Sequence, residues 1–195
     1  MPYMENRKGR KTQITKERIT EIAFIMTAEN GIDSVSSTTL AKRLNCSTQP
    51  IFWVFDTMND LRQAIFEQAL KLYNEYMATN IPLSKYNKSD AIGLTCIQFA
   101  KAYPNIYKLI FMTEQKENNI SKTDIDGNRN PITCAIKEVY CVTDEIAKKI
   151  IERMWVFTHG IATLLVTKTA DFNNEQINEM FTDVNMGLLK QYQGG

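Results

Sequence analysis

The chain has 195 residues, enough for one large helical domain or for a small domain joined to a medium one. Its 44% hydrophobic and 23% charged residues are ordinary for a soluble globular protein, and no segment reads as a signal peptide or a membrane span. The net charge of +1 argues against non-specific attraction to polyanions, and we expect a cytoplasmic protein with no membrane partner.

The N-terminal residues form a local exception to this charge balance. Residues 7–18 carry a net charge of +5, so the rest of the chain sums to −4. Lys8, Arg10 and Lys11 are part of this basic arm. Such an asymmetry favours local contact with a polyanion, although a solvated tail is the alternative.

Helical spacing of apolar residues then follows along the chain. Thr15 is placed to cap a first helix, and Asn30-Gly31 ends it with residues that tolerate the left-handed conformation. Ser36 or Ser37 caps a short second helix, Ser37–Leu44, and Asn45-Cys46 makes a tight turn.

The next segment, "IFWVF" at 51–55, resembles a buried strand when taken alone. We predict instead a short helix, Ser47–Val54, capped by Ser47. Pro50 then falls in the first turn, where a missing N–H costs little because those amides have no intrahelical acceptor. Ile51 and Phe55 are the expected core anchors.

The remaining elements are predicted to be longer helices. The expected caps are Thr57, with Asp60 three positions on, Asp144, and Asn173 with Gln176. Ser89, Asn105 and Pro131 are expected to be the first residues of their helices. Residues 113–130 are polar and are expected to form a loop. The sequence therefore predicts an all-α protein of about nine helices with no strand.

Two short helices joined by a tight turn have helix-turn-helix proportions. Such a unit presents the first residues of its second helix, here Thr48, Gln49 and Pro50, to base edges in the major groove. A Gln amide can bond adenine in bidentate fashion, and Thr or Pro can touch a thymine methyl. The basic arm supplies cations for phosphates. These features favour double-stranded DNA as a partner.

Residues 14–61 also resemble the DNA-binding domain of TetR-type transcriptional regulators. The matching features are Ala23 with Asn30-Gly31, Thr39-Leu40-Ala41, the Asn45-Cys46-Ser47 turn, the aromatic-x-x-Phe element at 52–55, and Asp60-Leu61. The segment "MWVFTHGIATLL" looks like a recurring element in one branch of the family's C-terminal domains.

This resemblance implies a helix-turn-helix domain over residues 1–60 and a helical ligand-binding and dimerisation domain over 61–195. It implies a homodimer, more often a repressor than an activator, that binds a pseudo-palindromic operator and is released by a small molecule. The expected DNA-contacting residues are Lys8, Arg10, Lys11, Ser37, Thr38, Thr39, Lys42, Ser47, Thr48, Gln49, Pro50, Phe52 and Trp53.

Three positions depart from the family pattern. Phe52 stands where tyrosine is usual, Val54 where histidine is common, and Met58 where a lysine often contacts phosphate. Lys42 or Arg43 and the basic arm are candidate replacements for the missing charge. Trp53 is expected either to donate its indole N–H to a phosphate or to pack on the first helix.

A small-molecule site is expected in the C-terminal part. The candidate lining residues are Phe99, Tyr103, Tyr107, Phe111, Met112, Trp155 and His159, although aromatic residues at helical spacing also form plain core. His159 lies four residues after Trp155 on one helix face, with Gly160 beside it. A buried, hydrogen-bonded histidine near a dimer contact is the alternative.

Other functions have less support. Four cysteines, at 46, 96, 134 and 141, form no CxxC pair. Cys134 and Cys141 would lie about 10 Å apart on one helix, too far for a disulfide, yet a cysteine-based redox response stays open. With one histidine, no metal-ligand spacing and no phosphate loop, we expect no enzyme, metal or cofactor. A helical protein-interaction module is the main alternative to DNA binding.

Overall fold

A computed structural model describes residues 14–83, 88–113, 137 and 141–193. Within these residues there are eight α-helices and no strand, which confirms the all-helical prediction. The loop expected over 113–130 and the helix expected from Pro131 lie almost entirely outside the described residues. The helices are α1 Lys16–Asn30, α2 Ser37–Arg43, α3 Gln49–Phe52, α4 Met58–Asn80, α5 Lys88–Ala102, α6 Pro104–Phe111, α9 Asp144–Val166 and α10 Asn174–Gln193, with 3-10 turns η1 Ile32–Ser34 and η2 Ile81–Leu83.

Side-chain caps fix most helix starts where the sequence predicts them. Thr15 accepts a hydrogen bond from the Arg18 amide at 3.2 Å. Thr57 and Asp60 form a reciprocal capping box at the start of α4. Asn173 and Gln176 exchange backbone-to-side-chain bonds, both at 2.9 Å, at the start of α10. These local bonds satisfy amides that have no acceptor within the helix.

Two predicted starts are wrong by one residue. Helix α5 begins at Lys88, one residue before the expected Ser89. Thr143, not Asp144, caps α9, because its extended backbone lets its hydroxyl accept from the Ile146 amide. The Asp144 carboxylate pairs instead with Lys137, and this contact lowers the pKa of Asp144.

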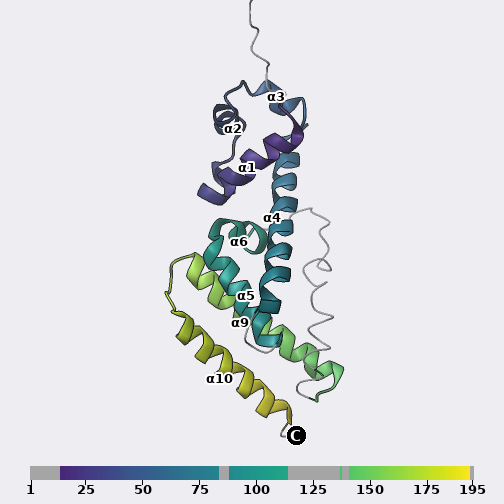
Figure 1. The fold of residues 1–195 in the computed structure, drawn as a ribbon, viewed down its shortest axis with the longest axis vertical. Coiled ribbons are helices and arrows are strands. Elements are labelled where there is room, and N and C mark those ends of the chain that lie inside the picture. Colours follow the sequence, from purple (N-terminus) through teal and green to yellow (C-terminus); the bar gives the residue numbers. More distant parts are fainter. Residues whose placement is uncertain (1–13, 84–87, 114–136, 138–140, 194–195) are drawn as a thin grey trace, which may run out of the picture.

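The helices form an elongated molecule, with α1, α2 and α3 at one end and α10 at the other (Figure 1). Helix α4 runs from the first group into the second, so the predicted boundary at 60/61 falls within its first turn. Helix α6 lies across the molecule beneath α1 (Figure 1). A single cluster of buried apolar side chains continues through both groups, from Ile19 of α1 to Phe181 of α10.

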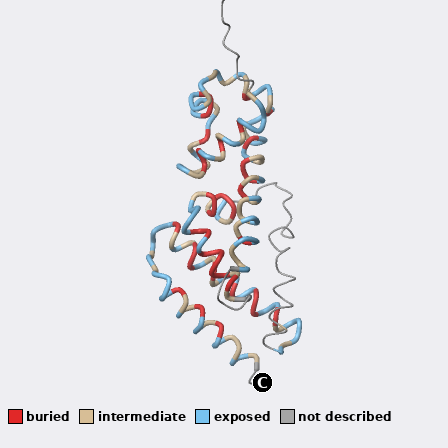
Figure 2. Tube along the Cα trace, in the orientation of Figure 1, coloured by how far each residue is buried: buried red, intermediate tan, exposed pale blue. Residues whose placement is uncertain are grey.

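Burial is uneven along this axis. Buried residues concentrate in α5, α6 and α9, whereas α2, α3 and α10 alternate buried positions with exposed ones (Figure 2). Gly93 of α5 marks a close helix approach, because a Cβ there would lie 2.5 Å from the Phe181 ring.

Candidate nucleic-acid interface and helical sensor region

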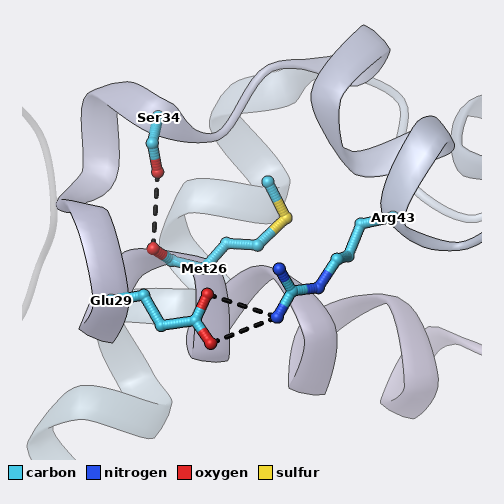
Figure 3. Close-up of polar contacts among 4 residues, drawn as sticks. All are labelled: Met26, Glu29, Ser34 and Arg43. Carbon is cyan, nitrogen blue, oxygen red and sulfur yellow. Dashed lines mark hydrogen bonds and ion pairs between the residues drawn. The ribbon is translucent and has the colours of Figure 1, made fainter.

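Polar contacts to α1 are made at the end of α2 and in η1, the turn that precedes α2 (Figure 3). The Arg43 guanidinium donates to both carboxylate oxygens of Glu29, at 3.1 and 3.2 Å. The Ser34 hydroxyl, in η1, bonds the Met26 carbonyl at 3.4 Å. Neither Glu29 nor Ser34 was singled out from the sequence, since their role depends on how α2 crosses α1.

The start of α2 uses Ser36, one of the two serines expected there. Ser36 and Thr39 form a capping box, and the Thr39 hydroxyl lies 2.8 Å from the Ser34 carbonyl. Thr39 therefore has a structural role in addition to its predicted contact with DNA. Thr38 and Lys42 are exposed, and Ser37 is half-buried.

The turn between α2 and α3 follows the prediction, but α3 is shorter than expected. Asn45 adopts a positive φ of 55°, which asparagine tolerates better than most residues. Helix α3 then covers only Gln49–Phe52, and Thr48 stands at its cap position without a side-chain bond. The predicted Ser47 cap is thus wrong. Pro50 lies in the first turn as predicted.

The "IFWVF" segment divides into anchors and exposed aromatics. Ile51 is fully buried and Phe55 is 3% exposed, which confirms both as core anchors. Two backbone amides, those of Val54 and Phe55, bond the Ile51 carbonyl and fix this turn. Phe52 is 44% exposed and Trp53 is 74% exposed. The alternative in which Trp53 packs on the first helix is wrong, because Ile51 and Phe55 occupy the inward side.

The outward side chains of Ser47, Thr48, Gln49, Pro50, Phe52 and Trp53 form what we term the α3 face. Each of these six side chains is exposed or half-buried. The face lies at the end of the molecule, where α3 turns outward (Figure 1). Lys8, Arg10 and Lys11 of the basic arm lie outside the described residues.

Most cations near the α3 face are engaged within the protein. Arg43 pairs with Glu29, and Arg18 pairs with Glu21 at 2.8 Å. The Lys16 ammonium lies 5.4 Å from the centre of the Phe55 ring. Of the two α2 cations proposed as substitutes for the missing phosphate contact, Arg43 pairs with Glu29 of α1 at an exposed site, while Lys42 is exposed with no ion pair among the described residues.

A second group of predicted residues gathers between α4, α5, α6 and α9. Ring contacts connect six of the seven predicted ligand-site residues into one aromatic cluster, Met112 being the exception at 43% exposed. The cluster also contains two tyrosines of α4. Tyr73 contacts the rings of Phe99 and Phe111, and Tyr76 contacts those of Phe99 and Tyr103. Tyr73 was missed, although it lies four residues after buried Ala69 and so shares its helix face.

His159 is tied to this aromatic cluster by a hydrogen bond. Its Nδ1 lies 2.6 Å from the Tyr107 hydroxyl, and its ring contacts Trp155 and Phe111. Burial raises the pKa of the Tyr107 hydroxyl well above its ordinary value. The hydroxyl therefore keeps its proton at neutral pH, and which of the two groups donates in this bond depends on the histidine tautomer.

An open hollow of about 520 Å³ lies along α9. We term its lining the α9 face, formed by Trp155, Val156, His159, Gly160, Thr163 and Leu164. Only Trp155 and His159 belong both to this face and to the predicted ligand site, and Phe99 and Tyr107 are fully buried. A Cβ added at Gly160 would meet nothing within 4 Å. The glycine is thus not required by packing within one chain.

The described cysteines differ in reactivity. Burial raises the pKa of the Cys96 thiol to about 12. Since the thiolate is the reactive form, Cys96 is poorly suited to a redox response. Cys46 is half-buried and Cys141 is exposed, while Cys134 lies outside the described residues.

Comparisons with known proteins identify no family for this chain. The chain matches no protein-family model and no curated protein. None of the helices in the described part of the chain is long and apolar enough to cross a bilayer. Across those same residues, no three His, Cys, Asp or Glu side chains gather in a group that can hold a metal ion.

Proposed function

We propose that the protein is a DNA-binding transcriptional regulator that uses the α3 face to contact the major groove. The observation that carries this proposal is the contrast within five consecutive residues. Ile51 and Phe55 are buried, while Phe52 and Trp53 are turned outward beside exposed Gln49. A short helix anchored in this way presents side chains of fixed orientation, as base readout requires.

The capped helix pair before this face supports the same proposal. Ser36 and Thr39 fix the start of α2, and Arg43 fixes its end to Glu29 of α1. These contacts position α2, and α3 after it, without using the outward side chains of α3. The resemblance of residues 14–61 to TetR-type regulators agrees with this use of the helix pair.

The proposed regulator is a homodimer that recognises a pseudo-palindromic operator. Apolar side chains at the other end of the molecule support the dimer, since Val156 is 60%, Leu164 37% and Met186 51% exposed. Gly160 and Gly187 leave open space on α9 and α10, which allows a second helix to approach closely. A homodimer contact over these two helices would cover this surface.

A response to a small molecule, most simply release of a repressor, is the remaining part of the proposal. Helix α6 supports this response because its side chains contact both α1, next to the proposed DNA-binding helices, and α9, which carries the α9 face. Asn105 donates to the Ala28 and Glu29 carbonyls at the end of α1, and Tyr107 bonds His159 of α9. A ligand that separates Tyr107 from His159 would shift α6, and with it the position of α1.

The test is a gel-shift titration with DNA from the intergenic region beside the gene. We expect Thr48→Ala/Gln49→Ala to weaken binding by about tenfold or more with an unchanged circular dichroism spectrum, since neither side chain caps α3. The matched control is Thr79→Ala/Gln98→Ala, which removes two exposed side chains of the same types from α4 and α5. Equal affinities for the wild type and the α3 variant would reject the proposed interface.

A protein-docking role is the second candidate, because two neighbouring exposed aromatics also suit a protein partner. This alternative predicts no salt-dependent binding to any duplex from the intergenic region. It also predicts that Trp53→Ala abolishes capture of a protein partner. DNA binding that weakens as salt rises would exclude it as the main function.

A further inference from the structure

The α3 face has an unusual chemical composition for a surface that reads DNA. From Leu44 to Phe55 there is no Lys, Arg, His, Asp or Glu. Guanine is most often read by Arg or Lys, which donate to its O6 and N7, and cytosine by a carboxylate that accepts from its amino group. Neither partner is available in this segment.

The cations that flank the segment do not replace a guanine reader. The Arg43 guanidinium is bound to both oxygens of Glu29 and is thereby directed towards α1 (Figure 3). Lys42 lies in the last turn of α2, the helix that crosses the DNA backbone in such units. A lysine there is suited to a phosphate contact, which carries no sequence information.

Of the hydrogen-bonding groups that remain, the Ser47 and Thr48 hydroxyls can bond any base, and the side-chain amides match adenine. Gln49 is exposed at the first position of α3, and Asn45 is exposed at the turn before it. A side-chain amide has one donor and one acceptor, the pattern that complements N7 and the amino group of adenine.

The apolar side chains of the α3 face match thymine. The C5 methyl of thymine is the only apolar group that an unmodified base pair presents in the major groove. Pro50 is half-buried beside Gln49, and Phe52 and Trp53 are the exposed aromatics that follow. Contact with a thymine methyl removes apolar surface from water on both partners.

We propose that the α3 face selects A·T base pairs, reading adenine through the Gln49 amide and thymine through apolar contact with its methyl group. This inference rests on the proposed DNA binding and adds the class of half-site that is bound. It requires the face to keep one orientation, and the burial of Ile51 and Phe55 in the core anchors it.

The test begins with selection of duplexes from a random-sequence pool by the full-length protein, followed by titration of a selected duplex. Deoxyuridine then replaces thymidine in the half-site, which removes the C5 methyl and leaves base pairing unchanged. We expect affinity to fall about fourfold for each methyl that the face buries. Uracil placed outside the half-site is the matched control and should have no effect.

Gln49→Ala supplies the second measurement. The variant should bind the selected duplex about tenfold more weakly than the wild type and should lose most of its preference for A·T over G·C at one position. Selection of G·C-rich half-sites, or equal affinity for the thymine and uracil duplexes, would overturn the inference while leaving DNA binding intact. Failure to enrich any duplex over a protein-free selection would overturn both proposals.

Discussion

At the residue scale, the division of the "IFWVF" segment into inner and outer side chains has a direct consequence for stability. Ile51 is fully buried, so Ile51→Ala should lower the free energy of unfolding by about 2–5 kcal/mol. Trp53 is 74% exposed, and Trp53→Ala should change it by no more than about 0.5 kcal/mol. Urea unfolding followed by circular dichroism measures both. A Trp53 variant as unstable as the Ile51 variant would contradict the outward orientation.

The buried Cys96 thiol predicts a pH dependence of stability. Its pKa is about 12 in the folded chain, against about 8.5 when unfolded. Above pH 8.5 the unfolded chain loses a proton that the folded chain keeps, so stability falls as pH rises between these values. Tyr107 and Tyr73, whose pKa values burial also raises, act in the same direction only at higher pH.

Urea unfolding at pH 7.5 and at pH 9.5 isolates the cysteine from the tyrosines. The wild type should lose stability between these two pH values, and Cys96→Ala should lose less. Cys141→Ala is the control, since Cys141 is exposed and its replacement should leave the wild-type pH dependence unchanged. An equal loss in wild type and Cys96→Ala would show that the thiol is not the group responsible.

At the element scale, the sequence predicts helix starts well where a cap is a local pattern. The Thr57–Asp60 and Asn173–Gln176 boxes each form within four residues, so the chain's own spacing specifies them. Helix α3 was predicted too long because its apolar run continues to Phe55, whereas the regular helix ends at Phe52. The helix ends before Phe55, whose side chain is buried in the core. That burial depends on tertiary packing, which the local sequence does not specify.

The contact between α6 and α1 is an element-scale feature that no sequence pattern indicates. The Asn105 amide donates to the Ala28 and Glu29 carbonyls at 3.0 and 3.2 Å, across more than seventy residues of chain. Asn105→Ala should lower the free energy of unfolding by about 1 kcal/mol. Asn74→Ala is the matched control in unfolding experiments, since Asn74 is exposed on α4. Identical effects of the two substitutions would show that the α6–α1 bonds contribute nothing.

At the scale of the whole molecule, the two ends of the fold carry different surfaces. Six of the predicted DNA-contacting residues form the α3 face, while Ser37, Thr38, Thr39 and Lys42 lie on α2 and the basic arm lies outside the described residues. The predicted ligand residues divide instead between a buried aromatic cluster and the open α9 face. Sequence spacing places residues on one side of one helix, but it does not determine whether that side faces a cavity, the core or the surface.

The α9 face predicts the effect of charge on assembly. Val156→Glu/Leu164→Glu places two carboxylates on the apolar surface that we propose to be covered in a homodimer. Sedimentation velocity should show a dimeric wild type and a folded monomeric variant, because burial of unpaired charge is strongly unfavourable. Gln98→Glu, at an exposed position of α5, should stay dimeric. A dimer that persists in the double variant would place the contact elsewhere.

Hydroxyl-radical footprinting of the intergenic DNA tests most directly whether the α3 face of a homodimer contacts DNA. The wild type should protect two segments on one face of the duplex, about one helical turn apart or a multiple of that spacing. Thr48→Ala/Gln49→Ala should lose both protections together, while Thr79→Ala/Gln98→Ala keeps them. The same footprint from the α3 variant and the wild type would contradict the proposed contact between the α3 face and DNA.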